Sequence, residues 1–153
     1  MKAVHIYLAD DDADDRELFI DALNEIPVQT EVQEFSNGVD LMDALFSKTD
    51  LPDAVFLDLR MPLMDGFECL ADIRSFPQFS KIKIFVYSTS YHEMEVNQLK
   101  SDGADHYLQK PNSFQLLKSL LFQSVTLLES ETKMCGPSSQ FILSAKTSDL
   151  TNS

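Results

Sequence analysis

Short apolar stretches alternate with helical patterns along most of the chain. Short apolar runs predict five strands, at residues 4–9, 29–35, 54–57, 82–87 and 106–109. Apolar residues spaced three or four positions apart predict five helices, at residues 13–25, 37–46, 66–75, 93–101 and 113–129. Five successive strand–helix units predict an α/β fold, in which a parallel sheet carries helices on both faces.

Residues at the ends of the predicted elements agree with this division. Asp12 is a suitable N-cap for the helix at 13–25, and Asp14 and Asp15 in its first turn complement the helix dipole. The strand at 54–57 is apolar throughout, as expected for a strand that is covered on both faces.

Residues 131–153 differ in composition from the rest of the chain. They are rich in Ser and Thr, contain a Gly-Pro pair and are too few for a second domain. We expect a single domain over residues 1–130, followed by a flexible tail at 131–153 with no output domain. Phe141, Ile142 and Leu143 form the only apolar cluster of that tail.

Composition and charge narrow the classes of function. The chain has 153 residues and a formal net charge of −13 at pH 7, which argues against nucleic acid or an anionic membrane surface as the main partner. No apolar run approaches the roughly 20 residues of a membrane-spanning helix, and we see no signal peptide before the first strand. The two cysteines, Cys69 and Cys135, lack the spacing of a zinc site or a disulfide framework. We therefore expect a cytoplasmic protein.

Polar residues follow four of the five predicted strands. Because the carboxyl ends of parallel strands meet at one edge of a sheet, we expect these residues to lie together, where such folds bind their ligands. In chain order they are Asp10, Asp11 and Asp12, then Asp58, then Ser88, Thr89 and Ser90, and finally Lys110.

These residue types suit the transfer of a phosphoryl group to a carboxylate. Carboxylates crowded at one edge repel each other, and a divalent cation relieves that repulsion. Oxygen ligands without His or Cys favour Mg²⁺ over zinc. A carboxylate such as Asp58 can act as a nucleophile and form an aspartyl phosphate. Mg²⁺ and Lys110 would offset the charge on the phosphoryl oxygens, and Ser88 would hydrogen-bond them.

Simpler interpretations exist for single residues. An acidic run before a helix is often only a solvated cap, and for Asp12 capping is the expected role. Lys110 alone would be read as a surface lysine, and Tyr107 could be a core residue of its strand. Only the combination of these residues with Asp58 favours a phosphorylation site.

Over residues 4–129 the chain resembles the receiver domain of two-component response regulators. The resemblance rests on features in a fixed order, namely Asp10-Asp11, the segment from Asp58 to Gly66, the Ser88 hydroxyl and Lys110-Pro111. It implies a flavodoxin-like, doubly wound, five-stranded parallel sheet with strand order 2-1-3-4-5 and five helices.

The resemblance also implies roles for the residues at the sheet edge. Asp58 would accept the phosphoryl group, and Ser88 and Lys110 would contact it. The ligands of Mg²⁺, or of Mn²⁺ in its place, would be Asp10, Asp11, Asp58 and the backbone carbonyl of Arg60. The bond between Lys110 and Pro111 would be cis, as is usual in the family.

Three positions concern switching and rate. Tyr107 would be the aromatic switch residue, which moves when Ser88 is drawn toward the phosphoryl group. Arg60 and Thr89 are larger than the residues common at these positions of the family, and Ser88 stands where Thr is commoner. We expect Arg60 and Thr89 to tune the rates of phosphorylation and hydrolysis.

The implied function is that of a phosphoacceptor switch in a two-component phosphorelay. The donor would be a phosphohistidine of a sensor histidine kinase or a histidine phosphotransfer protein. The signal would pass on by protein contact or by onward phosphotransfer. Such a protein is not an enzyme, apart from catalysing its own phosphorylation and slow self-dephosphorylation.

Other functions are weighed against this one. A Mg²⁺-dependent phosphohydrolase of the haloacid dehalogenase type would need a second acid two residues after Asp58, where this chain has Arg60. A phosphorylation-independent binding module on the same fold would normally lack the acceptor, an acid or the lysine, and all of these are present. A nucleotide-binding protein is not favoured, because the chain has only four glycines and neither GxGxxG nor GxxxxGK[ST].

The last predicted helix, at 113–129, is more apolar than one buried face requires. Its core-facing stripe consists of Leu117, Leu120, Leu121, Val125 and Leu128. Leu116, Phe122 and Leu127 lie beyond that stripe. We expect this surplus to form a surface for a partner or a homodimer. The alternatives are that the tail folds back over it, or that it is buried in a larger core.

Overall fold

The computed structural model describes residues 3–47, 49–131 and 141–144. In chain order its elements are β1 (Val4–Ala9), α1 (Ala13–Asn24), β2 (Thr30–Phe35), α2 (Gly38–Ser47), β3 (Ala54–Leu57), α3 (Gly66–Ser75), the 3-10 turn η1 (Pro77–Phe79), β4 (Lys83–Ser88), α4 (Glu93–Ser101), β5 (His106–Gln109), α5 (Phe114–Glu131) and β6 (Ile142–Leu143). All five predicted strands and all five predicted helices are present, with ends that differ from the prediction by no more than two residues.

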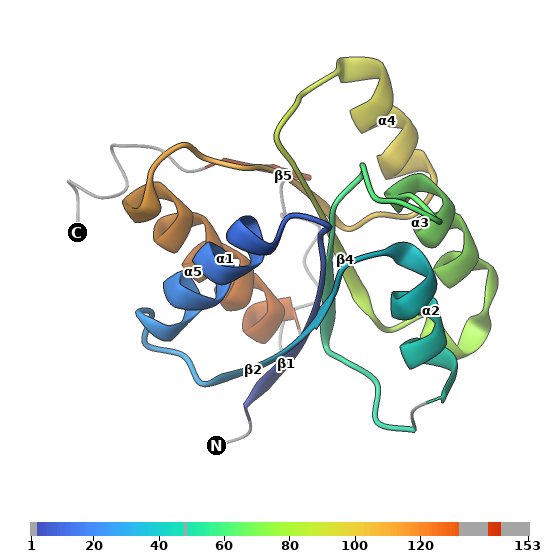
Figure 1. The fold of residues 1–153 in the computed structure, drawn as a ribbon, viewed down its shortest axis with the longest axis horizontal. Helices are drawn as coiled ribbons and strands as arrows, with labels where there is room; N and C mark the ends of the chain where they lie inside the picture. The colour runs from blue at the N-terminus through green and yellow to red at the C-terminus, as the bar shows by residue number, and fades with distance from the viewer. Residues whose placement is uncertain (1–2, 48, 132–140, 145–153) are drawn as a thin grey trace.

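The strands form one parallel sheet with the order β2-β1-β3-β4-β5-β6. The predicted order of the first five strands is therefore confirmed. Helices α1 and α5 cover one face of the sheet, and α2, α3 and α4 cover the other (Figure 1). This arrangement brings the carboxyl ends of β1, β3, β4 and β5 to one edge.

Both faces of the sheet are buried under apolar side chains. In β3, Val55 and Leu57 join the core beneath α2 and α3, whereas Ala54 and Phe56 join the core beneath α1 and α5. All four side chains are fully buried. This explains why β3 is apolar at every position, since successive residues of a strand point to opposite faces.

Acidic caps fix the first turns of two helices. Asp12 accepts hydrogen bonds from the backbone N–H groups of Asp14 (2.9 Å) and Asp15 (3.3 Å), so its predicted capping role is confirmed. Asp65 begins α3 in a capping box with Glu68, in which each side chain accepts from the other residue's backbone N–H. Both caps satisfy N–H groups that have no partner inside the helix.

A sixth strand was not predicted. β6 lies within the stretch expected to be a tail and runs parallel to β5, with Ile142 beside Tyr107 and Leu143 beside Leu108. The backbone N–H of Tyr107 donates to the carbonyl of Phe141 at 2.9 Å. Leu143 is 6 % exposed and belongs to the core that includes α1 and α5. The rest of the expected tail, residues 132–140 and 145–153, lies outside the described residues.

Helix α5 shows the predicted buried stripe. The stripe residues Leu117, Leu120, Leu121, Val125 and Leu128 are all buried. Leu116 and Leu127 are half-buried, and Phe122 is 42 % exposed. An apolar side chain therefore remains on the open side of α5, and the interface expected there stays a prediction. None of the helices in the described residues is long and apolar enough to cross a membrane.

Candidate functional site

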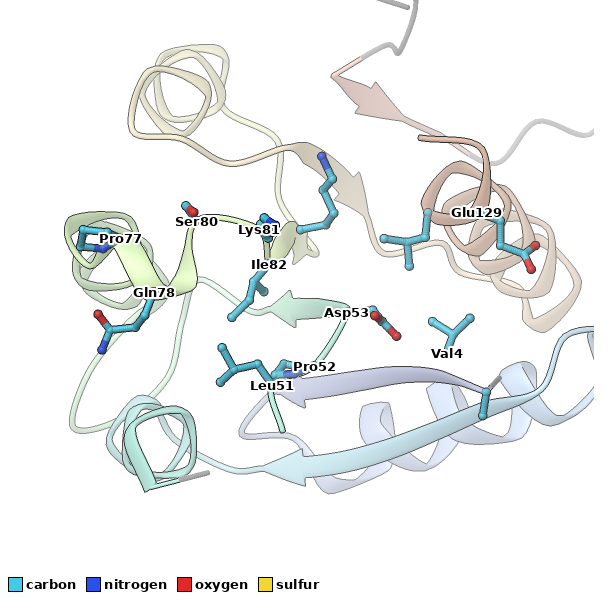
Figure 2. A pocket seen from close by; sticks show the side chains of 13 residues that line it. Val4, Leu51, Pro52, Asp53, Pro77, Gln78, Ser80, Lys81, Ile82 and Glu129 are labelled. Atoms are coloured by element: carbon cyan, nitrogen blue, oxygen red, sulfur yellow. The ribbon is translucent and has the colours of Figure 1, made fainter. Parts of the chain in front are cut away.

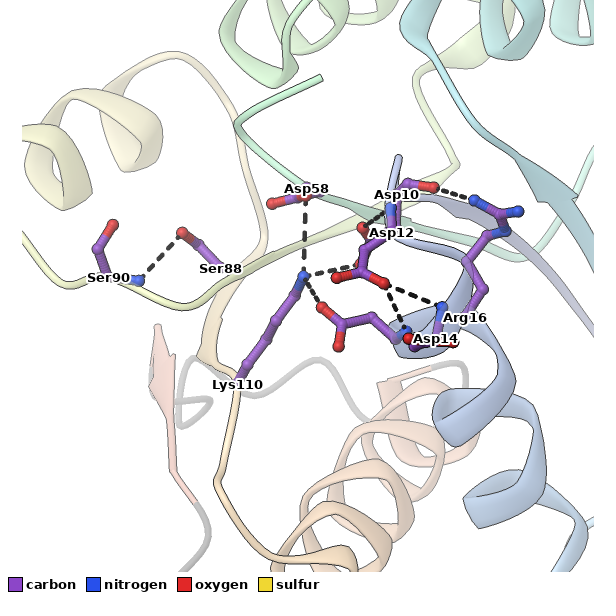
Figure 3. A network of polar contacts seen from close by, with 9 residues as sticks. Asp10, Asp12, Asp14, Arg16, Asp58, Ser88, Ser90 and Lys110 are labelled. Carbon is purple, nitrogen blue, oxygen red and sulfur yellow. Dashed lines mark hydrogen bonds and ion pairs between the residues drawn. The ribbon is translucent and has the colours of Figure 1, made fainter. Parts of the chain in front are cut away.

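The predicted polar residues lie together at the carboxyl edge of the sheet (Figure 3). Asp10 directly follows β1, Asp58 follows β3, Ser88 ends β4 and Lys110 follows β5. Asp10 and Ser88 are each 1 % exposed, and Asp58 is 7 % exposed. We call this group the acidic rim, consisting of Asp10, Asp11, Asp58, Ser88 and Lys110. The burial of Asp10 and Asp58 is unusual for acids and indicates that each has a charged or hydrogen-bonding partner.

Three carboxylates of the acidic rim are placed to share a cation. Asp10, Asp11 and Asp58 each offer an oxygen, and these oxygens lie within 4.8 Å of one another. Asp10 and Asp58 are buried and Asp11 is exposed, so the cluster opens toward solvent on one side. An all-oxygen set with an open side fits a hard divalent cation that retains water ligands.

Lys110 supplies the positive charge of the rim. Its Nζ is 2.7 Å from Asp10 Oδ2, 2.9 Å from Asp15 Oδ2 and 3.7 Å from Asp58 Oδ2. Burial alone would lower the pKa of Lys110, but its hydrogen bond to Asp10 and the charge of Asp58 outweigh burial and raise it. Lys110 is therefore charged at neutral pH. Among the described residues no peptide bond is cis, so the predicted cis bond between Lys110 and Pro111 is wrong.

Burial changes the acidity of Asp58. The pKa of the Asp58 carboxyl is raised to about 7, mainly by removal from water; the charge of Lys110 opposes this rise and the nearby Asp10 adds to it. Lys110 thus offsets only part of the rim's negative charge. A second cation beside the carboxylates would favour the ionised form of Asp58, which is the form that can act as a nucleophile.

The loop after Asp58 is shaped by close backbone contacts. A Cβ atom on Gly66 would lie 2.4 Å from the carbonyl oxygen of Asp58, so only glycine allows α3 to begin against this backbone. The Gly66 N–H donates to the Leu59 carbonyl at 3.0 Å. Between them, Leu63 has a positive φ of 69° and is 78 % exposed. The loop is held against the backbone at Asp58 and Leu59 and exposes the apolar side chain of Leu63 to solvent.

Ser88 and Tyr107 are connected through the loop that follows β4. The N–H of Ser90 approaches the Ser88 hydroxyl at 3.4 Å, and the Tyr107 hydroxyl donates to the Ser90 carbonyl. Tyr107 is 1 % exposed, and its ring meets that of Tyr91 edge-on at 5.9 Å. In this conformation Tyr107 is turned inward and fastened to the loop next to Ser88.

The family model for the response regulator receiver domain matches residues 6–122. The chain belongs to the response regulator receiver domain family. The match includes every residue of the acidic rim, and the resemblance inferred from the sequence is confirmed.

Solved receiver structures share this fold. The phosphorylated cyanobacterial phytochrome response regulator RcpA superimposes with a TM-score of 0.79 at 26 % identity, over 88 % of this chain and all of that one. The Mn²⁺-bound form of the response regulator Rcp1 gives a TM-score of 0.73 at 26 % identity, over 85 % of this chain and 96 % of that one. The flavodoxin-like receiver fold is thus confirmed.

Curated relatives are much longer proteins. The sensor histidine kinase CheAY of Helicobacter pylori is 26 % identical over 124 residues, which cover 80 % of this chain and 15 % of that kinase. The hybrid signal transduction histidine kinase K of Dictyostelium discoideum is 25 % identical over 129 residues, covering 80 % of this chain and 10 % of that protein. This receiver therefore spans only a small part of the length of these relatives.

The two residues predicted to tune rates point outward. The Arg60 side chain is 62 % exposed, and its Nη2 lies 3.2 Å from Glu95 Oε2 in the first turn of α4. Thr89 is exposed at the end of β4. The ion pair of Arg60 with Glu95 thus links the loop after β3 to α4.

Sequence reasoning missed two residues that organise the acidic rim. Asp15 was read only as a complement to the helix dipole, yet it is a direct ion-pair partner of Lys110. Arg16 donates to the carbonyl of Asp10 at 2.6 Å and pairs with Glu34 at 3.0 Å, tying α1 to β1 and β2. Asp15 lies one helical turn after Asp11, and that spacing could have placed it at the same edge.

A separate hollow of this receiver lies at the opposite end of the sheet (Figure 2). It is a cavity of about 750 Å³ at the amino ends of β1, β3 and β4. Its lining residues include Val4, Pro52, Asp53, Lys81 and Ile82. No residue of the acidic rim lines it, so this cavity is not the candidate site.

Proposed function

We propose that this receiver is the phosphoacceptor switch of a two-component phosphorelay, which takes a phosphoryl group from a phosphohistidine onto Asp58 in a Mg²⁺-dependent reaction. One observation carries the proposal. Asp58 is a buried carboxylate whose neighbours are Asp10 and Asp11, within cation-sharing distance, and the Lys110 ammonium at 3.7 Å. These are the groups that aspartyl-phosphate chemistry needs at one point.

The proposed transfer balances as a substitution at phosphorus. An Asp58 oxygen forms a bond to phosphorus while the phosphorus–nitrogen bond of the phosphohistidine breaks, and the electron pair of that bond returns to the imidazole. Mg²⁺ would be held by Asp10, Asp11 and Asp58, with the Arg60 carbonyl as a further ligand, and would offset charge on the phosphoryl oxygens. Lys110 is placed to offset the remaining negative charge from the other side.

Phosphorylation would be read out through Ser88 and Tyr107. The phosphoryl group would attract the Ser88 hydroxyl, and the bond from Tyr107 to the Ser90 carbonyl would then have to rearrange. Tyr107 could move within the space beside Ser88 and re-shape the surface of α4, β5 and α5. A two-state element of this kind turns a local charge into a change of shape.

The partners would be proteins. A sensor histidine kinase or a histidine phosphotransfer protein would supply the phosphoryl group, and output would follow by protein contact or onward phosphotransfer. The exposed Phe122 on α5 supports a partner or homodimer contact through this helix. We further propose a cytoplasmic location, in agreement with the free thiol of the buried Cys69, and no catalysis beyond self-phosphorylation and slow self-dephosphorylation.

The phosphohydrolase alternative has no support at the acidic rim. The position two residues after Asp58 is Arg60, whose guanidinium is paired with Glu95 and cannot act as an acid or base at neutral pH. A phosphorylation-independent module is likewise not favoured, because the acceptor Asp58, the acids Asp10 and Asp11 and the lysine are all present at the acidic rim.

The proposal is tested by labelling with a small phosphodonor. The full chain is incubated with acetyl phosphate and Mg²⁺, and intact mass is measured before and after alkaline treatment. We expect one added phosphoryl group that is lost in alkali, and none in Asp58→Asn. Equal labelling of wild type and Asp58→Asn would overturn the assignment.

A further inference from the structure

The Lys110 ammonium has a partner that belongs neither to the cation cluster nor to the acceptor. Asp15 Oδ2 is 2.9 Å from Lys110 Nζ, closer than Asp58 Oδ2 at 3.7 Å. The cation-sharing cluster contains Asp10, Asp11 and Asp58, and not Asp15. This inference deepens the proposed function and rests on it.

A cation at the rim would compete with Lys110 for Asp10. Both oxygens of Asp10 are already engaged, since Oδ1 accepts from the Asp12 N–H at 3.0 Å and Oδ2 accepts from Lys110 at 2.7 Å. A carboxylate oxygen has a second lone pair, so a cation can bind Asp10 while both hydrogen bonds remain, but its positive charge repels the Lys110 ammonium and not the uncharged N–H of Asp12. The contact between Asp10 and Lys110 is therefore the one that a bound cation loosens.

Asp15 is held where it can keep the lysine in place. It occupies the first turn of α1, where the Asp12 cap fixes the backbone through bonds to two N–H groups. Its side chain is 32 % exposed, so it is partly in water but not free. The Lys110 ammonium also lies 5.1 Å from the centre of the Tyr87 ring. A long and flexible lysine needs such anchors, because fixing its side chain costs considerable rotamer entropy.

We propose that Asp15 is a positioning residue, which holds the Lys110 ammonium beside Asp58 when a divalent cation takes over Asp10. The ammonium then keeps one donor on Asp15 and turns another toward the oxygens of the incoming phosphoryl group. Asp15 touches neither phosphorus nor the cation and acts only through Lys110.

Asp14 provides a matched control for the effect of Asp15 on the helix dipole. A carboxylate in the first turn of a helix stabilises the helix dipole, whatever else it does. Asp14 occupies the same turn, carries the same charge and is exposed, and its side chain makes no ion pair with Lys110 among the contacts of the described residues. Asp14→Asn therefore removes the dipole effect without touching the lysine.

The experiment compares four full-length variants, Asp15→Asn, Asp14→Asn, Lys110→Met and the double variant Asp15→Asn/Lys110→Met. At saturating Mg²⁺, the dissociation constant of beryllofluoride and the initial rate of labelling by acetyl phosphate are measured. We expect Asp15→Asn to weaken both by roughly tenfold, the size of one lost charge-assisted hydrogen bond, and Asp14→Asn to change them by less than about twofold. In the Lys110→Met background, Asp15→Asn should have no further effect.

A metal-free readout checks the contact itself. In EDTA, the free energy of unfolding is measured for wild type, Asp15→Asn, Lys110→Met and the double variant. These four values form a double-mutant cycle, from which we expect a favourable coupling energy between Asp15 and Lys110. Zero coupling, equal losses in Asp14→Asn and Asp15→Asn, or faster labelling in Asp15→Asn would each overturn the inference. If wild type itself takes up no phosphoryl group, the proposed function fails instead.

Discussion

The two ends of the sheet differ in what they offer a ligand. The carboxyl end holds the acidic rim, in which the charged side chains of Asp10, Asp58 and Lys110 are largely withdrawn from solvent. The amino end holds a cavity of about 750 Å³, lined by the segments that precede β1, β3 and β4 and by the last turns of α5. The cavity is lined by no residue of the acidic rim, whereas the rim brings together charged residues that follow the three strands β1, β3 and β5.

This difference has a structural cause. Parallel strands deliver their following residues to the same edge, so residues far apart in sequence, such as Asp10 and Lys110, meet there. At the amino end, the loops that lead into the strands bring together no such set of acidic residues within the described part of the chain, and a cavity lies between them. In this receiver the candidate site is therefore marked by converging buried charges, and the cavity lies away from it.

The largest effect should come from the acceptor itself. Asp58→Asn keeps the size of the side chain but removes the nucleophilic carboxylate, so labelling by acetyl phosphate should disappear entirely. Ile82→Val, in the cavity at the other end, should cost about 0.5–1.5 kcal/mol of unfolding free energy and leave labelling unchanged. Intact-mass measurement and urea unfolding read the two effects separately. Loss of labelling in Ile82→Val would break the contrast between the two ends.

The next effect concerns the cation. Asp11 is the exposed member of the cluster, and Asp11→Ala should raise the Mg²⁺ concentration needed for labelling by at least about tenfold, since even indirect partners of metal ligands cost that much. Lys81→Ala, which removes a charge at the cavity, is the control and should not change the Mg²⁺ dependence. An unchanged Mg²⁺ requirement in Asp11→Ala would place the cation elsewhere.

The acidity of Asp58 should make stability depend on pH. Because the pKa of Asp58 is raised to about 7 in the fold, the folded chain holds a proton between about pH 4 and pH 7 that the unfolded chain releases. The contribution of this carboxyl to stability is present below that window and is lost as pH rises through it. Asp58→Asn, compared with wild type in EDTA, should therefore gain relative stability with rising pH, by up to about 1.4 kcal/mol per pH unit. Parallel pH profiles of the two proteins would contradict the raised pKa.

Much of this fold and of its site was predictable, for a physical reason. Apolar runs and helical periods report burial directly, so β3 could be recognised as a strand covered on both faces. Turn and cap residues such as Asp12 act locally and can be read one at a time. The rim followed from topology, because parallel strands gather their ends.

The features that escaped prediction depend on contacts between distant segments. β6 has only two residues, and its partner β5 lies before α5 in the sequence, so no local pattern marks β6 as a strand. The pairing of Arg60 with Glu95 depends on how α4 is placed over the sheet. The ion pair of Asp15 with Lys110 was also missed, because the position of Asp15 in the first turn of a helix already explained its charge.

A conformational response should be confined to the rim side of the molecule. With beryllofluoride and Mg²⁺, we expect faster amide exchange in the loop after β4 and at the N–H of Tyr107, which now donates to Phe141. The loop at 51–53 beside the cavity should exchange as before. Tyr107→Phe cannot donate a hydrogen bond to the Ser90 carbonyl. In this variant, the difference in amide exchange rates with and without beryllofluoride should be smaller than in wild type. Exchange that is the same with and without beryllofluoride would remove the proposed switch.

The smallest effects should be on the lifetime of the phosphorylated state. We expect Thr89 and Arg60 to border the path by which water would reach a phosphoryl group on Asp58. Thr89 is exposed and bulkier than alanine, so Thr89→Ala should speed the loss of label by roughly two- to fivefold, equivalent to about 0.4–1 kcal/mol of barrier. The decay of purified phosphorylated protein is followed by intact mass. A decay in Thr89→Ala no faster than in wild type would remove the steric explanation.

Arg60 requires a separate comparison, because its charge and its bulk have opposite consequences. A guanidinium near the phosphoryl group could speed hydrolysis by stabilising charge, whereas its bulk would slow the approach of water. In the fold Arg60 is drawn toward Glu95, so Glu95→Gln should release it toward the rim while Arg60→Asn removes it. If bulk dominates, Arg60→Asn shortens the lifetime and Glu95→Gln lengthens it, each by no more than a fewfold. A longer lifetime in Arg60→Asn and a shorter one in Glu95→Gln would show that the charge of Arg60 dominates. Lys81→Ala, at the cavity, should have the lifetime of wild type in either case.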